Sequence, residues 1–174
     1  MKTPQYPVGS FEAVIHLNAE ERQLRIARLA AFPLDLKAMA VRLNSSQWEQ
    51  TYRLGGWTAI QVLNHLADSH LHSYARFKHA VTEDSPTIKD YPEALWAALK
   101  EGSDKASVVA SINMLKGIHY RWVAFLHSLK ESDFDKTFYH PETETHHSLH
   151  KALAYYSWHC DHHLGHLNII AQIA

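Results

Sequence analysis

The sequence predicts an all-α protein whose long helices pack as a four-helix bundle. Apolar residues recur at helical spacing through four segments of roughly 25 residues each, while the alternation typical of strands is almost absent. Most of the six glycines and six prolines fall between these segments, where such residues interrupt secondary structure. Because each helix would carry one apolar stripe, four of them bury their stripes best against one another as a bundle.

The first helix is predicted to run from Ala19 to about Leu43. Asn18 followed by Glu21 resembles a capping box, with asparagine in place of the usual serine or threonine. Pro33 lies within this segment and either kinks the helix or marks a turn. The helical spacing rests on a set of apolar residues: Leu24, Ala27, Ala31, Leu34 and Met39.

The remaining long helices are predicted by similar patterns. The second begins near Thr58, after the loop signal Gly55-Gly56, and ends at about Val81, since Pro86 prevents its continuation. After it we expect a long connection over residues 86–102, with a short helical turn at Glu93–Leu99. A third helix should follow from about Ser103 to Leu129. A loop from Asp133 to Glu144 then leads to a last helix from about Ser148 to Ile173. The long connections leave room for crossovers and are natural places for a functional site.

Length, charge and cysteine content restrict the classes of protein that this sequence can represent. The chain has 174 residues, which predicts a single domain over residues 1–174. A formal net charge of -1 and the lack of a basic stripe argue against a nucleic-acid binder. No apolar run approaches the ~18 residues of a membrane span, and the first residues lack the apolar run of a signal peptide. Cys160 is the single cysteine, so no intrachain disulfide can form and we expect a cytoplasmic protein.

Fifteen histidines are the unusual feature of the composition, and the last helix carries two pairs of them spaced four residues apart. Residues at this spacing lie on one face of a helix, so either pair can hold one metal ion. His159 and His163 border the apolar stripe, whereas His162 lies farthest from it and should be mostly solvated. This geometry favours the first pair over His162 and His166, and it places Cys160 in the core.

A third ligand must come from another helix, because one helix cannot close a coordination sphere, and catalytic zinc sites typically use three protein ligands. The second helix offers His65, His70 and His72. Helical periodicity places His70 on the apolar face and His65 on a polar stripe almost opposite it. His65 is then either a solvent-facing residue or a ligand that lines an open cleft, and spacing alone leaves both interpretations open.

Several segments match a known family in their order and spacing over nearly the whole chain. They are Gly55-Gly56-Trp57-Thr58, Gln61-Val62, His65-Leu66-Ala67-Asp68-Ser69-His70, Arg76-Phe77-Lys78, Thr82-Glu83-Asp84, Pro86-Thr87-Ile88-Lys89, Arg121-Trp122, Thr137-Phe138-Tyr139-His140-Pro141-Glu142, and Tyr156-Ser157-Trp158-His159 with His162-His163. In these segments the chain resembles the DinB/YfiT-like metalloproteins, and most closely their YfiT branch.

The resemblance implies a four-helix bundle with up-down-down-up connectivity. It also implies one divalent metal ion per chain, zinc or nickel, held by three histidines, which at the matching positions are His65, His159 and His163. The resemblance therefore agrees with the geometry of the last helix, and it selects His65 where periodicity alone would select His70. It further implies that the protein forms a homodimer.

Such a metal site could catalyse either of two reactions on a small-molecule substrate. The first is metal-dependent hydrolysis by activated water, and the second is transfer of a low-molecular-weight thiol, of the bacillithiol type, to an electrophile. No side chain is assigned as the nucleophile, because the sequence shows no Ser-His-Asp pattern and no partnered cysteine. The alternative is a metal-binding or stress-response module without catalysis. Asp68 and Asp161 are candidates to orient the metal ligands.

Overall fold

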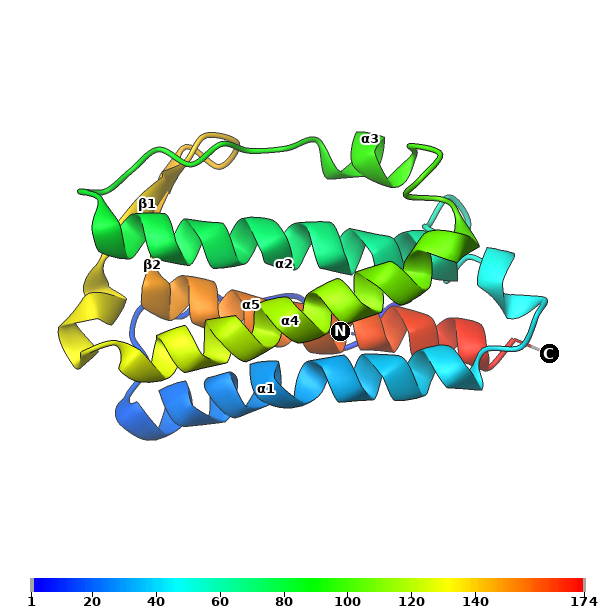
Figure 1. The fold of residues 1–174 in the computed structure, drawn as a ribbon, viewed down its shortest axis with the longest axis horizontal. Coiled ribbons are helices and arrows are strands. Elements are labelled where there is room, and N and C mark those ends of the chain that lie inside the picture. Colours follow the sequence, from blue (N-terminus) through cyan, green and yellow to red (C-terminus); the bar gives the residue numbers. More distant parts are fainter. Residues whose placement is uncertain (1, 174) are drawn as a thin grey trace.

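The computed structural model describes residues 2–173 and places four long helices side by side (Figure 1). These are α1 (Ala19–Arg42), α2 (Ala59–Thr82), α4 (Val108–Ser128) and α5 (Leu149–Ala171). In Figure 1, α1 and α5 run in one direction and α2 and α4 in the other. The expected all-α bundle with up-down-down-up connectivity is therefore confirmed.

The order of the helices around the bundle makes α2 and α5 neighbours. Helix α1 packs against α4 and α5, and α2 packs against the same two helices. Consecutive helices α1 and α2 therefore lie diagonally across the bundle, as do α4 and α5. This arrangement brings the second and last helices, which carry the candidate ligands, face to face although they are far apart in the sequence.

Polar caps fix where three of the long helices begin. Asn18 and Glu21 form the expected capping box at α1, and Thr58 and Gln61 form another at α2. In each box, side-chain oxygens accept hydrogen bonds from two backbone N–H groups. Without the box these N–H groups would lack partners at the start of the helix. At α5, Ser148 accepts a hydrogen bond from the backbone N–H of Lys151. The caps of α2 and α5 thus set the registers in which their histidines are presented.

The structure decides the role of Pro33 and moves one predicted boundary. Helix α1 continues through the buried Pro33 to Arg42, so this proline does not mark a turn. The third long helix begins at Val108 rather than near Ser103, because Asp104 first caps a short 3-10 turn over residues 105–107.

The expected loop over residues 133–144 is wrong, because part of it forms a hairpin. Strand β1 (Thr137–His140) pairs antiparallel with β2 (Thr145–Ser148), and Phe138 lies opposite His147. Phe138 is buried against the bundle. Strands of four residues give too short an alternation to be recognised in the sequence, and their pairing depends on this packing.

The other connections contain short elements: η1 (Gln47–Glu49), α3 (Glu93–Ala97), η2 (Lys105–Ser107) and η3 (Glu131–Asp135). Helix α3 confirms the predicted helical turn. It lies above α2 in Figure 1, so the long connection after α2 crosses back over that helix. None of the helices in the described part of the chain is long and apolar enough to cross a membrane.

The core of the bundle combines large apolar side chains with buried histidines. Among the largest fully buried side chains are Phe32, Leu36, Leu63, Leu66, Phe77, Leu115, Trp122 and Leu126. His70 and His119 lie between them with exposed fractions of 0% and 1%. Buried polar groups are costly unless they are hydrogen-bonded, so these two rings need partners, which are described below.

Candidate metal centre

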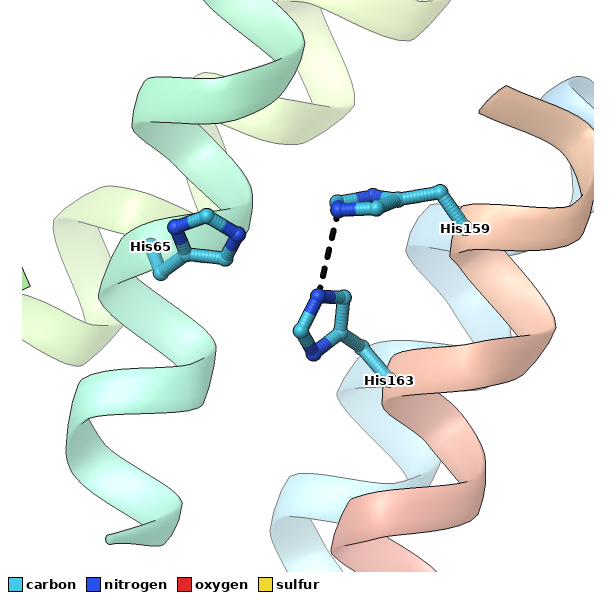
Figure 2. A group of neighbouring side chains, drawn as sticks. All are labelled: His65, His159 and His163. Carbon is cyan, nitrogen blue, oxygen red and sulfur yellow. Dashed lines mark hydrogen bonds between the residues drawn. The ribbon is translucent and has the colours of Figure 1, made fainter. Parts of the chain in front are cut away.

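Three histidines from two helices converge at the interface between α2 and α5. His65 comes from α2, while His159 and His163 come from consecutive turns of α5 (Figure 2). One nitrogen of each ring lies within 4.8 Å of one nitrogen of the other two. The structure thus brings together the three residues selected on the sequence.

The spacing of the two α5 nitrogens suits a shared ion. The Nε2 atoms of His159 and His163 lie 3.1 Å apart, as the dashed line in Figure 2 shows. Zinc–nitrogen bonds of 2.0–2.1 Å in a tetrahedral arrangement separate two ligand nitrogens by about 3.3 Å. The donor set of three imidazoles is also one that zinc and nickel accept. The residues present therefore fit a divalent ion.

Burial keeps the three imidazoles neutral. It lowers the pKa of His65 to about 3, with smaller contributions from His162 and His166. Burial likewise lowers the pKa values of His159 and His163 well below the ordinary value. Only the neutral ring has a lone pair to offer a metal, so all three rings are in the ligating form at neutral pH.

The segment before α2 places an aromatic cover over His65. Gly55 has a φ of +68°, a left-handed conformation that glycine adopts without strain. The turn leads into Trp57, whose ring centroid lies 4.5 Å from that of His65, and then into the cap residue Thr58. The Gly-Gly-Trp-Thr segment therefore starts the helix and covers one side of the candidate centre.

His65 is buried, with an exposed fraction of 3%. Of the two interpretations that periodicity left open, the solvent-facing one is wrong. His65 contacts Trp57 and the two histidines of α5. Farther along the same polar stripe, His72 stacks on Tyr91 of the connection after α2, so tertiary contacts cover the stripe. His70 lies in the core, as periodicity placed it.

His162 was expected to be mostly solvated, and this expectation is wrong, because its exposed fraction is 9%. Its ring stacks on Trp158 and lies near Tyr6 from the N-terminal segment. Gly165 permits this packing, since a Cβ atom there would lie 2.6 Å from Cγ of Pro7. The N-terminal segment therefore covers the side of α5 that the helical pattern assigns to solvent.

The hydrogen-bond partners of the α5 ligands are histidines that the sequence interpretation did not select. His70 Nε2 lies 3.1 Å from Nδ1 of His159, and His166 Nδ1 lies 3.3 Å from Nδ1 of His163. The candidate Asp161 instead accepts a hydrogen bond from Arg28 at 2.7 Å. Nothing in the sequence indicated that His70 would be a hydrogen-bond partner of His159, because a histidine on the apolar face of a helix is typical of a core residue.

The other two residues singled out near the centre are not hydrogen-bonded to it. Asp68 makes no hydrogen bond to the three candidate ligands within residues 2–173, and burial raises its pKa to about 6. Cys160 is fully buried, and burial raises its pKa well above the ordinary value, so the thiol is protonated. This agrees with its expected place in the core.

Two adjoining cavities lead to the centre. A cavity of about 340 Å³ surrounds the three histidines, and a larger one of about 860 Å³ ends on His159. Glu93, Tyr155 and His159 line both. Volumes of this size are typical of pockets for small molecules.

Charged groups line the larger cavity. The guanidinium of Arg76 donates to the Tyr156 hydroxyl at 3.3 Å and to Asp90 at 3.4 Å, and its buried Nε has no partner within the described residues. Lys151 adds a second positive charge, while burial and the nearby Glu142 and Asp90 raise the pKa of Glu93. The cavity therefore suits a polar molecule with a charged group.

Comparison with known proteins places these features in a family. The model of the DinB superfamily matches residues 28–167. "Putative metal-dependent hydrolase YfiT" of Bacillus subtilis is 38% identical over 167 residues, covering 96% of this chain and 93% of the relative. A protein of Bacillus mycoides with the same description is 41% identical over 173 residues, covering 99% and 98%.

A solved structure shows the same architecture. It is that of YfiT from Bacillus subtilis, described as "a probable metal-dependent hydrolase with an unusual four-helix bundle topology". It superposes with a TM-score of 0.93 at 37% identity, over 97% of this chain and 96% of the other.

Proposed function

This chain belongs to the DinB superfamily, and from that premise we propose that it is a metal-dependent enzyme whose single zinc or nickel ion is held by His65, His159 and His163. The observation that carries the proposal is the convergence of these three buried, neutral imidazoles at the end of a cavity for small molecules. The relatives described as metal-dependent hydrolases support an enzymatic role.

A divalent ion bound by three neutral ligands keeps its full charge and supplies Lewis acidity, which lowers the pKa of a water molecule or a thiol. The chain's own residues have three further tasks. His65, His159 and His163 fix the reacting position beside the cavity. Trp57 excludes water from one side. Arg76, which lines the larger cavity, binds a negatively charged group of the substrate.

We favour transfer of a low-molecular-weight thiol, of the bacillithiol type, to an electrophile. In this reaction the thiol loses its proton to solvent, its sulfur forms a bond to the electrophilic carbon, and the leaving group departs with the electron pair of the bond that breaks. The larger cavity offers Arg76 and Lys151 for acidic groups of such a thiol, and Asp90 for an amine. Hydrolysis is the second candidate, supported by the description of the relatives.

The metal assignment is tested on protein purified without chelator. We expect about one zinc or nickel ion per chain by elemental analysis, and its loss in His159→Ala, His163→Ala and His65→Ala. His127→Ala is a matched control, since His127 lies exposed at the end of α4. Retention of stoichiometric metal by His159→Ala and His163→Ala would refute the assignment.

The reaction is tested by following the consumption of 1-chloro-2,4-dinitrobenzene with and without bacillithiol. Thiol-dependent release of chloride by the metal-loaded protein, lost in His159→Ala, is the expected result. Turnover of an ester such as p-nitrophenyl acetate that is indifferent to thiol would favour hydrolysis. Metal-loaded protein that is inactive in both assays would favour the non-catalytic metal-binding module.

We also propose a homodimer that acts in the cytoplasm. Leu34 and Val41 support the dimer, because they lie two turns apart on α1 and expose 69% and 78% of their surface. Contiguous exposed apolar patches are typical of subunit contacts, and these two side chains would form part of such a patch. The molar mass from light scattering tests the dimer, and a monomer at micromolar concentration would contradict it.

A further inference from the structure

A chain of hydrogen-bonded histidines connects His159 to the backbone of α1. His119 Nδ1 lies 2.6 Å from the carbonyl oxygen of Leu29, and His119 Nε2 lies 2.7 Å from Nδ1 of His70. His70 Nε2 in turn lies 3.1 Å from Nδ1 of His159. His70 and His119 are fully buried, and both rings lie 5.4 Å from the ring of Phe32, which limits their rotation.

The carbonyl oxygen at the end of this chain dictates where every proton lies. A carbonyl only accepts, so Nδ1 of His119 carries a proton and, in the neutral ring, Nε2 is an acceptor. His70 must then donate from Nδ1 and accept at Nε2. His159 therefore donates from Nδ1, which leaves its Nε2 with a free lone pair. Burial lowers the pKa of His119 to about 4, in keeping with a neutral ring.

A second, shorter chain orients His163 in the same way. His166 Nε2 lies 3.2 Å from the carbonyl oxygen of Gln5, so it donates its proton there. His166 Nδ1 is then an acceptor, and His163 donates to it from Nδ1 across 3.3 Å. The Nε2 atom of His163 is thus left with a free lone pair as well.

We propose that His70, His119 and His166 are positioning residues, which form two relays ending on the carbonyls of Leu29 and Gln5 and which fix His159 and His163 in the tautomer that ligates through Nε2. This inference rests on the proposed metal site. Its consequence is that two lone pairs face each other across 3.1 Å. They repel in the metal-free protein, and a cation between them relieves that repulsion, so the site is preorganised for an ion.

The relays replace the carboxylate or carbonyl that usually accepts the second N–H of a ligating histidine. Asp68 makes no such bond within the described residues, and Asp161 is paired with Arg28. Two imidazoles, those of His70 and His119, bridge His159 on α5 to the backbone of α1, and each passes on the orientation that it receives.

The test compares His119→Leu with His119→Gln. Leucine fills the core but removes both hydrogen bonds, whereas the glutamine amide retains a donor and an acceptor. We expect His119→Leu to weaken zinc binding by about 10- to 100-fold, measured by competition with a chromophoric chelator, and His119→Gln to restore most of the affinity. His150→Leu is the control, because it removes another buried histidine that accepts from the backbone of Leu17.

A second measurement needs no metal. Long-range proton–nitrogen spectra of the ¹⁵N-labelled, metal-free protein report which nitrogen of His159 carries the proton. We expect Nδ1–H in the wild type and a mixture of tautomers in His119→Leu. An unchanged tautomer, or an unchanged zinc affinity, would overturn the proposal.

This readout separates the relay from the proposed function. A wild type that shows the tautomer but binds no zinc would refute the metal enzyme and leave the relay intact. Should His119→Leu not fold, His166→Leu with its rescue His166→Gln tests the second relay at His163 by the same two measurements.

Discussion

At the scale of single residues, the candidate centre depends on close packing that is possible only where a residue has no side chain. Gly165 is the clearest case, because the N-terminal segment packs where its side chain would be. That contact holds Gln5 beside His166 and Tyr6 beside His162. A glycine in the middle of a helix costs roughly 0.5–1 kcal/mol relative to alanine, so its presence in α5 is explained by the packing that it allows.

We therefore expect Gly165→Ala to weaken zinc binding and to make the N-terminal segment more sensitive to protease, despite the better helix propensity of alanine. The reason is that a Cβ atom would lie 2.6 Å from Pro7 and displace the carbonyl of Gln5 from His166. Limited proteolysis and zinc titration measure both effects. Gly117→Ala in α4 is the control, since a Cβ atom there has no neighbour within 4 Å. Equal behaviour of the two variants would contradict this explanation.

At the scale of elements, the start of α2 determines how His65 is presented. The capping box of Thr58 and Gln61 lies two turns before His65, directly after Trp57. Local signals in the sequence were sufficient here, since two glycines followed by a helical pattern predict the start of the helix near Thr58. The hairpin of β1 and β2 could not be predicted in the same way, because Phe138 holds it through contacts with the bundle.

Removing the cap should affect stability and metal binding together. We expect Thr58→Ala to lower the free energy of unfolding by about 1 kcal/mol and also to weaken zinc binding, because the first turn of α2 then frays near His65. Asn18→Ala removes the corresponding cap of α1 and should cost a similar free energy without changing zinc affinity. Urea denaturation and zinc titration of both variants check this. A loss of affinity in Asn18→Ala as large as that in Thr58→Ala would show that the effect is not local.

At the scale of the whole molecule, the interior is built to hold neutral histidines. Burial lowers the pKa values of five of them to about 3 or 4: His65, His119, His147, His162 and His166. In the unfolded chain they titrate near 6.5. The unfolded state then binds more protons at mildly acidic pH, so the stability of the fold rises with pH in this range.

The metal-free protein should therefore be most stable above pH 6.5 and lose stability as the pH falls towards 4. Asp68, whose pKa is raised to about 6, acts in the opposite direction but contributes only one proton. Urea midpoints at pH 7.5 and pH 5 test the trend. His119→Gln should flatten the dependence, and the exposed His127→Gln should not. A midpoint that is independent of pH would mean that these histidines titrate normally in the folded state.

The sequence alone predicted the four long helices, the capping box of the first, and the position of His159 and His163 on one face of the last, because each follows from spacing within one helix. It did not determine whether His65 faces solvent, that His70 contacts a candidate ligand, or that His162 is covered. Periodicity measures the angle of a residue from the apolar stripe of its own helix. It carries no information about what packs against the other face. In this bundle the turn at Trp57 and the N-terminal segment cover those faces, so only the tertiary structure could decide which polar residues of α2 and α5 are buried.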